Sequence, residues 1–336
     1  MITVQRVELD DPRARSLWDE QQGELAARYG EPDIEFDFAD HMAPGDLIGS
    51  YLALDASGEA IGTGLVRWSP YDTGAGAVEV KRLYVRPAHR GHGHSRVIVG
   101  VLEQAALRAG AVRVVLETGV EQPEALVLYE RIGYARFPGY GEYKDDPRSV
   151  CFSKELPTRV LVVNGSIGAG KTSVAESAYD ALADRGAHAA MIDGDFLCQA
   201  RPTQTEDPFN QELLFANLAA VAPVYRQAGF GYVVVARVVE DLEDRARYAQ
   251  AFAVPSPAGG AMPAQVVIAR VTAPESTRKD RIVHRDLDPA WHQWGHARTV
   301  ELEANLVSLQ LDDVVVTNAD RSPRETAEEL LERVGW

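Results

Sequence analysis

The chain has 336 residues, more than one typical domain needs, and suits two domains that each bury their own core. Its 34 basic and 50 acidic residues give a formal net charge of −16, which argues against nucleic acid as a partner. No uncharged apolar run reaches the length of a membrane span, and the two cysteines lack metal-type spacing. We therefore expect a cytoplasmic protein with reduced thiols and no membrane partner.

The first 156 residues predict strands with a few helices between them. An acidic segment holds Glu31, Asp33, Glu35, Asp37 and Asp40; we interpret it as a solvated surface, although such a rim can also attract a cationic acceptor. Apolar alternation and turn residues predict strands at 2–9, 49–54, 60–68, 77–85, 111–117 and 149–154, and helices at 12–29, 95–108 and 124–134.

A glycine-rich turn between strand 77–85 and helix 95–108 predicts an anion site. It lacks the lysine-threonine pair that would handle Mg²⁺ and a γ-phosphate. Backbone N–H groups at a helix N-terminus are suited to phosphate oxygens. The histidines at 89, 92 and 94 do not predict a metal site, because no carboxylate or cysteine accompanies them. The turn consists of Arg90, Gly91, His92, Gly93, His94 and Ser95.

This turn and the later Leu-Tyr-Glu-Arg-x-Gly-Tyr stretch at 128–134 make residues 1–156 resemble the GCN5-related N-acetyltransferase family. The family signature [RQ]-x-x-G-x-[GA] is matched at Arg90 and Gly93, with Ser95 in the place of glycine or alanine. The resemblance implies an α/β domain with a mixed, mostly antiparallel sheet. It also implies acetyl-CoA as the donor, with its pyrophosphate on residues 90–95 and its pantetheine arm along the backbone of Leu83 and Val85.

The resemblance also places catalytic groups. Tyr129 would be the general acid that protonates the leaving CoA thiolate, although an aromatic residue at this spacing can also be core. Glu79 would relay the amine proton through water, or else be a salt-bridged strand residue. Tyr140 and Tyr143 resemble the closing aromatic loop of small acetyltransferases that act on amino-acid-like amines. The expected acceptor is an amine of a small molecule.

Pro157 breaks one strand before the next and marks a boundary, so the second domain is expected at 158–336. An apolar run at 160–163, a glycine loop and a helix at 171–185 form the context that a phosphate-binding loop requires. Lys171 would reach the terminal phosphates of ATP, and the Thr172 hydroxyl would bind Mg²⁺. The loop and first helical turn are Gly165, Ser166, Ile167, Gly168, Ala169, Gly170, Lys171, Thr172 and Ser173.

The rest of the second half predicts a doubly wound parallel sheet. Asp193 and Asp195 follow a strand, so both carboxylates should face the cleft at the carboxyl edge of the sheet. Asp193 would hold Mg²⁺, and Asp195 would orient or deprotonate an attacking hydroxyl. The expected strands are 187–192, 231–236, 265–271 and 314–317, and the expected helices are 209–227, 240–252 and 323–333.

This half resembles small-molecule phosphate-loop kinases, especially adenylylsulfate kinase and the chloramphenicol phosphotransferase-like group. Asp193-Gly194-Asp195 matches the first three residues of the Asp-Gly-Asp-Asn pattern, and Phe196 replaces its asparagine. Three arginines at spacings of three and four resemble the lid that neutralises the transferring phosphoryl group, with a solvated helix face as the alternative. They are Arg278, Arg281 and Arg285.

The pairing predicts a bifunctional enzyme. It would transfer acetyl from acetyl-CoA to a small-molecule amine and phosphoryl from ATP and Mg²⁺ to a small-molecule hydroxyl, as in two-step modification of an antibiotic or metabolite. Two alternatives stay open. The phosphate-loop domain can instead sense nucleotide and regulate the acetyltransferase, or it can be a nucleoside or nucleotide kinase. The sequence leaves both acceptors and the oligomeric state open.

Overall fold

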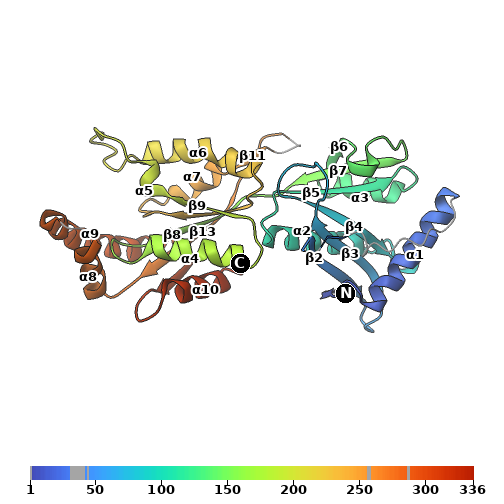
Figure 1. The fold of residues 1–336 in the computed structure, drawn as a ribbon, viewed down its shortest axis with the longest axis horizontal. Helices are drawn as coiled ribbons and strands as arrows, with labels where there is room; N and C mark the ends of the chain where they lie inside the picture. The colour runs from blue at the N-terminus through green and yellow to red at the C-terminus, as the bar shows by residue number, and fades with distance from the viewer. Residues whose placement is uncertain (1, 31–41, 44, 256–258, 286–287) are drawn as a thin grey trace. The chain divides into compact units, whose positions relative to one another are not determined.

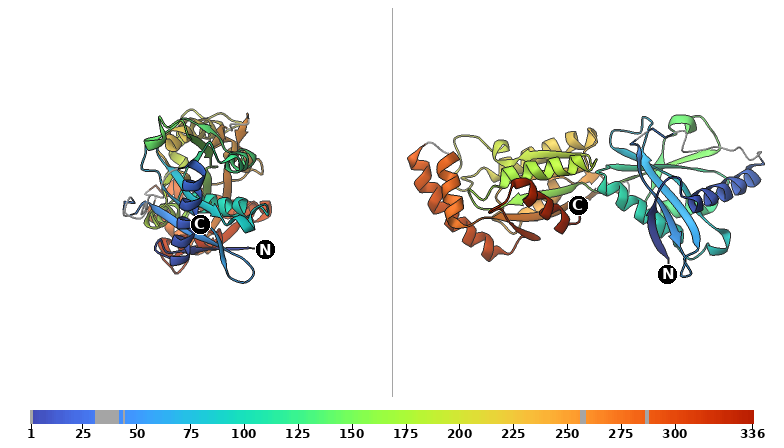
Figure 2. Two further views of the ribbon diagram at one scale, coloured as in Figure 1. Left: turned by 90° about the vertical axis from the view of Figure 1, so that its right-hand side faces the viewer. Right: turned by 60° about the horizontal axis from the view of Figure 1, so that its bottom comes forward.

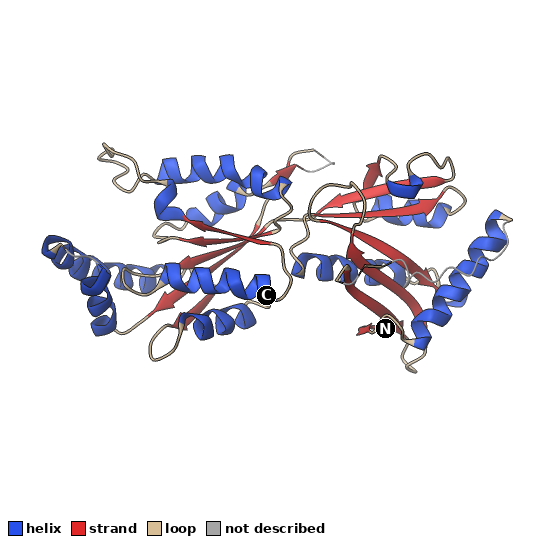
Figure 3. Cartoon of the chain, in the orientation of Figure 1, coloured by secondary structure: helices blue, strands red, loops and turns tan. Residues whose placement is uncertain are grey.

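The computed structural model describes residues 2–30, 42–43, 45–255, 259–285 and 288–336, and the chain divides into two compact units, Met1–Leu156 and Pro157–Trp336 (Figure 1). The acidic segment from Glu31 to Asp40 lies outside the described residues. Each unit combines helices with a central sheet (Figure 3). No helix in the described ranges is long and apolar enough to cross a membrane.

The N-terminal unit is built on a seven-stranded sheet with the order β1-β2-β3-β4-β5-β7-β6. Every neighbouring pair is antiparallel except β4 and β5, which are parallel, so the predicted mixed, mostly antiparallel sheet is confirmed. The strands are β1 (Thr3–Val7), β2 (Leu47–Leu54), β3 (Ala60–Trp68), β4 (Ala77–Val85), β5 (Arg113–Gly119), β6 (Ala135–Phe137) and β7 (Ser149–Glu155).

Helices cover both faces of this sheet because side chains alternate along each strand. On β2, Tyr51 and Ala53 pack in the cluster that holds the apolar side of α2, whereas Leu52 packs with Leu17 of α1. The Asp11 side chain caps α1, and Gly30 ends it in a left-handed conformation at φ 68°. The helices are α1 (Pro12–Tyr29), α2 (His94–Arg108) and α3 (Pro123–Arg131).

Two irregularities in β4 open the sheet. The parallel pairing with β5 joins only Ala77–Glu79 to Arg113–Val115, and both strands then continue without pairing to each other in the described part of the chain. On its other edge β4 carries one extra residue relative to β3, and Arg82 adopts a positive φ of 56° there. The bulge turns the second half of β4 away from β5, which leaves space between the two strands.

The C-terminal unit contains a five-stranded parallel sheet in the order β14-β13-β8-β10-β9. Helices α4 and α10 pack on one face and α6 and α7 on the other, so the predicted doubly wound parallel sheet is present. The strands are β8 (Arg159–Asn164), β9 (Ala189–Asp193), β10 (Tyr232–Ala236), β13 (Gln265–Thr272) and β14 (Val314–Thr317); the helices are α4 (Lys171–Asp184), α6 (Gln211–Gln227), α7 (Asp244–Ala251) and α10 (Pro323–Arg333).

Some elements of the C-terminal unit were not predicted. A one-turn helix, α5 (Gly194–Leu197), begins directly after β9, because the Asp193 side chain accepts a hydrogen bond from the Asp195 N–H. The arginine-rich segment, whose spacing had placed three arginines on one face of a helix, is indeed a helix, α8 (Glu275–Arg285); the long helix α9 (Pro289–Leu309) beside it was not predicted (Figures 1 and 2). A two-stranded ribbon joins β11 (Val254–Pro255) to β12 (Ala261–Met262).

Candidate functional sites

A cavity of about 1230 Å³ lies in the N-terminal unit where β4 and β5 diverge. Its walls come from the second half of α1, from β4, from the glycine turn before α2, from β5 and from α3. Such a volume is larger than most small-molecule pockets and suits an extended ligand. Of the residues predicted to hold acetyl-CoA, Leu83, Val85, Arg90, Gly91, Gly93, His94 and Ser95 line this cavity.

The glycine turn has the geometry of an anion site. Gly91 and Gly93 have φ values of 80° and 79°, which glycine adopts without strain. Gly93 is also the N-cap of α2, so no N-cap side chain takes the first N–H groups of the helix. His92, also predicted to bind the cofactor, is not among the described residues on the cavity wall, and its ring stacks on His94 at 5.7 Å.

Protein side chains already occupy part of the predicted cofactor path. The Leu83 carbonyl accepts a hydrogen bond from Gln21 Nε2 at 3.0 Å, and the Val85 carbonyl accepts one from Arg90 Nε at 2.8 Å. The terminal nitrogens of Arg90 donate to the two carboxylate oxygens of Glu24 at 2.8 and 2.6 Å. Helix α1 is therefore tied to β4 and to the glycine turn through polar contacts.

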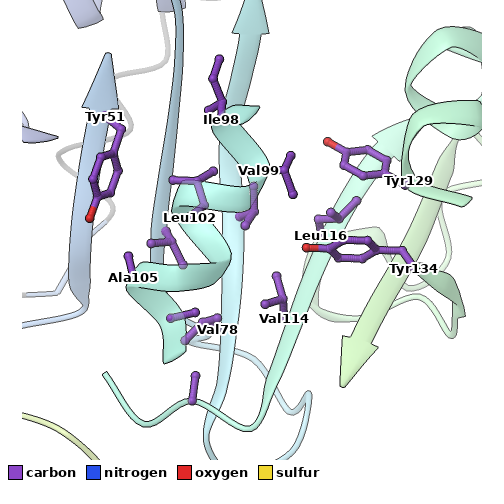
Figure 4. Packing of buried hydrophobic residues seen from close by; sticks show 14 of the residues in the cluster. Tyr51, Val78, Ile98, Val99, Leu102, Ala105, Val114, Leu116, Tyr129 and Tyr134 are labelled. Carbon is purple, nitrogen blue, oxygen red and sulfur yellow. The ribbon is translucent and has the colours of Figure 1, made fainter. Parts of the chain in front are cut away.

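Tyr129 lies on α3 and is among the residues that line the cavity; Figure 4 shows its ring next to that of Tyr134. Its ring packs against Tyr134 and Phe152 at centroid distances of 5.6 and 5.7 Å. Burial raises the pKa of the Tyr129 phenol, and the negative charge of Glu117 raises it further. The phenol is therefore protonated at neutral pH, as a proton donor must be.

Glu79 is fully buried in a polar network rather than on the cavity wall. Arg67 donates to Glu79 Oε2 from Nε at 3.0 Å and from Nη2 at 2.7 Å. The Tyr140 hydroxyl donates to Oε1 at 3.1 Å, and Lys81 Nζ lies 3.7 Å from the same oxygen. Glu79 is not among the described residues that line the cavity. Its surroundings are those of the salt-bridged strand residue that was the alternative interpretation.

Another carboxylate, Glu117 on β5, does line the cavity. Burial raises the pKa of its carboxyl group, although a hydrogen bond from the Ser149 hydroxyl at 2.8 Å and the charge of Lys81 lower that pKa. Glu117 was not predicted as a site residue, because the sequence marks it only as the last residue of an expected strand. The signal that could have found it is its position on the strand next to the one that carries the cofactor turn.

The phosphate-binding loop of the C-terminal unit joins β8 to α4 and depends on three glycines. Gly165, Gly168 and Gly170 have φ values of 148°, 77° and 98°. A Cβ atom on Gly165 would lie 2.3 Å from the Val271 carbonyl oxygen, and one on Gly170 would lie 2.2 Å from Asn318 Nδ2. The loop therefore needs glycine both for its backbone conformation and for the space it occupies.

We expect Gly168→Ala to destabilise the C-terminal unit by about 2 kcal/mol or more, because a Cβ would meet the backbone of Arg278 in addition to the left-handed strain. The added atom would lie 2.4 Å from the Arg278 carbonyl oxygen. Gly186→Ala is the matched control, since Gly186 has nearly the same φ of 76° and open space around it. Hydrogen exchange of peptides from 157–336 measures both; equal losses would contradict the steric argument.

Lys171 begins α4, and its ammonium group turns back to donate to the Ser166 carbonyl at 3.2 Å. Desolvation, together with the positive charges of Arg285 and Arg237, lowers the pKa of Lys171 to about 8, although the negative charges of Asp195 and Asp193 act in the opposite direction. Among the other predicted loop residues, Ser166 donates from its hydroxyl to Glu303 at 2.7 Å, and the Ile167 carbonyl accepts from Thr299 at 2.6 Å. Ser173 is exposed in the first turn of α4.

The predicted magnesium ligands lie next to each other. The Thr172 hydroxyl donates to Asp193 Oδ2 at 3.3 Å, and Asp193 Oδ1 accepts from the Asp195 N–H at 2.9 Å. A hydroxyl and a carboxylate are hard oxygen ligands of the kind that Mg²⁺ takes beside substrate phosphates. The pair therefore fits this ion, although no group of three or more His, Cys, Asp or Glu with metal-site geometry occurs among the described residues. Asp195 is ion-paired with Arg237 at the end of β10.

The three lid arginines differ in their contacts. Arg281 donates to the carbonyls of Gly168 and Ala169 at 3.3 and 3.1 Å and to that of Asn318 at 2.9 Å, so it holds the phosphate loop against the segment after β14. Arg278 is buried and donates to Thr299 at 3.1 Å. Arg285 is close enough to lower the pKa of Lys171. Of these three side chains, that of Arg281 contacts the phosphate loop and that of Arg285 affects its lysine, whereas Arg278 meets the loop through its backbone.

Comparison with known proteins identifies the family of the N-terminal unit. The model of the acetyltransferase (GNAT) family matches residues 12–134. An IAA acetyltransferase of Azospirillum brasilense is 36% identical over 106 residues, which cover 32% of this chain and 67% of that protein. The mouse protein named Probable N-acetyltransferase family 8 member 5 is 35% identical over 96 residues, which cover 28% of this chain and 42% of that protein.

A solved structure of the ribosomal-protein-S18-alanine N-acetyltransferase from Escherichia coli is 16% identical, with a TM-score of 0.35, and the match covers 46% of this chain and 94% of that one. The two curated relatives match a part of this chain that is about a third of its length. The family model covers the glycine turn, β5, Glu117 and Tyr129. Through residues 12–134 the chain belongs to the GNAT acetyltransferase family.

Proposed function

We propose that the N-terminal unit transfers the acetyl group of acetyl-CoA to an amine of a small molecule. The observation that carries the proposal is the cavity between β4 and β5, because the glycine turn, Glu117 and Tyr129 all line it. The nucleotide end of acetyl-CoA would lie at the N-terminus of α2, and the thioester would lie between the two strands.

In the proposed reaction the acceptor nitrogen attacks the thioester carbonyl, and the bond between that carbon and the sulfur breaks. Glu117 takes the proton that the amine loses, directly or through one water, and a raised pKa brings a carboxylate closer to that task. Tyr129 gives its phenolic proton to the departing thiolate. We assign the base to Glu117 rather than to Glu79, because Arg67 and Tyr140 already take both oxygens of Glu79.

Mass spectrometry of a pooled library tests this proposal. The protein is incubated with acetyl-CoA, ATP, Mg²⁺ and a mixture of aminoglycosides, amino acids, nucleosides and peptides, and products are sorted by added acetyl or phosphoryl mass. We expect acetylated amines that depend on acetyl-CoA. A protein that binds acetyl-CoA and acetylates no amine of the library, even at millimolar acceptor, would contradict a small-molecule acceptor of these classes.

The pH dependence of acetyl transfer tests Glu117. The base must be ionised, so kcat/KM should rise with pH through the pKa of Glu117, and burial places that pKa above the ordinary glutamate range. Glu117→Gln should lower kcat/KM by about 100-fold and remove this acidic limb. Glu79→Gln serves as the comparison, because it should lower stability and leave the limb in place. An acidic limb that survives in Glu117→Gln would contradict the assignment.

As a second candidate we propose phosphoryl transfer from ATP to a small-molecule hydroxyl by the C-terminal unit. The supporting observation is the contact between Thr172 and Asp193 at 3.3 Å beside Lys171. Thr172 and Asp193 would hold Mg²⁺, which neutralises phosphate charge when bound. Asp195 would orient the acceptor hydroxyl. The negative charge of the transferred phosphoryl group would be neutralised by Lys171, Arg281 and Arg285.

The aspartates separate this activity from nucleotide sensing. Asp193→Asn and Asp195→Asn should abolish phosphorylation of any compound that the library experiment identifies, whereas a sensor should keep its nucleotide response in both variants. Phosphorylation confined to the nucleosides of the library would favour a nucleoside kinase. One compound that gains both groups would establish two-step modification by a single chain.

A further inference from the structure

Four charged side chains that line the cavity are linked one to the next by ion pairs. Glu24 of α1 pairs with Arg90 at 2.8 and 2.6 Å, and it also accepts a hydrogen bond from Arg28 at 3.1 Å. Arg28 in turn pairs with Glu124 at the start of α3 at 2.6 Å. All four residues line the cavity. The two positive and two negative charges of these four residues balance.

Three nitrogen atoms of the Arg90 guanidinium donate hydrogen bonds to groups of the protein itself. Its Nε donates to the Val85 carbonyl at 2.8 Å, and both terminal nitrogens donate to Glu24. The carboxylate raises the pKa of Arg90 and neutralises its charge locally. A phosphate that entered beside the intact pair would gain little from the guanidinium and would be repelled by Glu24. The cavity that we propose for a polyanionic cofactor thus carries an anion of its own.

We infer that Glu24 is an internal counter-anion, which the pyrophosphate of acyl-CoA displaces from Arg90, so that this ion pair sets how tightly the cavity holds acyl-CoA. The inference rests on the proposed acetyl-CoA site. Displacement frees two terminal nitrogens that suit a phosphate as well as a carboxylate. It also loosens one of the polar contacts by which α1 is tied to the glycine turn.

The same helix supplies a matched control. Glu20 lies one turn before Glu24 and pairs with Arg86 at 2.7 Å, as Glu24 does with Arg90. Neither Glu20 nor Arg86 is among the described residues on the wall of this cavity. The two pairs fasten α1 to the segment after β4 in the same way, but only one of them faces the proposed cofactor.

The experiment is calorimetric titration of the full chain with acetyl-CoA at low and high salt. We expect Glu24→Gln to bind acetyl-CoA about fivefold more tightly than wild type at low salt, because one negative charge near the pyrophosphate is removed. High salt should reduce the gain. Glu20→Gln should leave the affinity unchanged.

The possible outcomes separate this inference from the proposed function. Wild type that fails to bind acetyl-CoA would overturn the proposed acetyl transfer itself. If wild type binds and Glu24→Gln binds no more tightly, the counter-anion role is overturned while acetyl transfer stands. An equal gain in Glu20→Gln would also overturn it, since a loosened helix rather than the ion pair at Arg90 would then explain the effect. Thermal unfolding of each variant confirms that the fold is retained.

Discussion

Replacement of Tyr129 by phenylalanine should lower kcat for acetyl transfer by about 100-fold and change KM for acetyl-CoA little. The substitution removes only the hydroxyl group, which we propose protonates the CoA thiolate. The ring contacts with Tyr134 and Phe152 remain, so the fold of α3 and the cavity wall should persist. The rate is followed by the appearance of free CoA thiol, with any amine that the library experiment identifies.

Tyr134→Phe is the matched control for this prediction. Tyr134 is a second buried tyrosine in the same cluster, with its ring centroid 5.6 Å from that of Tyr129, and it is not among the described residues on the cavity wall (Figure 4). Loss of the Tyr134 hydroxyl should leave the rate of acetyl transfer unchanged. If Tyr129→Phe retains kcat within about twofold of wild type, Tyr129 is a packing residue, as the alternative interpretation of the sequence has it.

The main elements of the fold could be predicted from the sequence because their signals are local. The helix at 12–29 was predicted with the bounds that the structure shows, since Asp11 and Pro12 mark its start and Gly30 its end. The parallel sheet of the second unit followed from apolar strand runs that alternate with helices. Loop glycines were predicted in the same way, because the phosphate-loop pattern states which positions must be glycine.

The lining of the N-terminal cavity could not be predicted in the same way. Glu79 was predicted as the base because it lies on the strand that should face substrate, but the partners that bury it, Arg67 and Tyr140, come from another strand and a later loop. At Arg82, which has a positive φ, β4 carries one extra residue relative to β3. Beyond this bulge, the alternation of side chains between the two faces of the sheet is shifted by one residue. Glu117 faces the cavity only because β4 and β5 diverge, and divergence is a property of the sheet rather than of either strand.

In the second unit too, contacts between residues far apart in the sequence decide what a side chain does. Arg281 was predicted as a lid residue that meets the transferred phosphoryl group. In the structure its guanidinium holds the carbonyls of Gly168 and Asn318, which lie 113 and 37 residues away in the chain. A spacing of three and four on one helix identifies a face but does not say what that face contacts. The lid role of Arg281 therefore stays a prediction that its present contacts do not require.

Lys171→Met should weaken binding of ATP with Mg²⁺ by about 100-fold and remove phosphoryl transfer, because it deletes the charge that meets the phosphates and keeps the length of the side chain. Calorimetric titration with ATP measures the first effect without any knowledge of the acceptor. Lys279→Met is the control, since Lys279 lies on α8 and pairs with Glu275 at the surface at 2.5 Å. Equal affinities of wild type and Lys171→Met would contradict a phosphate-binding role.

The lowered pKa of Lys171 also predicts that the protein takes up protons when nucleotide binds. Its pKa of about 8 in the nucleotide-free protein means that near pH 8 roughly half of the molecules carry the neutral amine. Phosphate oxygens favour the ammonium form and raise this pKa, so binding at pH 8 should draw up to about half a proton per molecule from the buffer. The heat of binding at pH 8 should then depend on the ionisation enthalpy of the buffer. At pH 6.5 this dependence should be weaker, once the proton uptake of ATP itself is subtracted. In Lys171→Met the extra proton uptake should vanish. If wild type and Lys171→Met take up the same number of protons at pH 8, the ammonium does not meet the phosphates, and the loop would then hold nucleotide through its backbone alone.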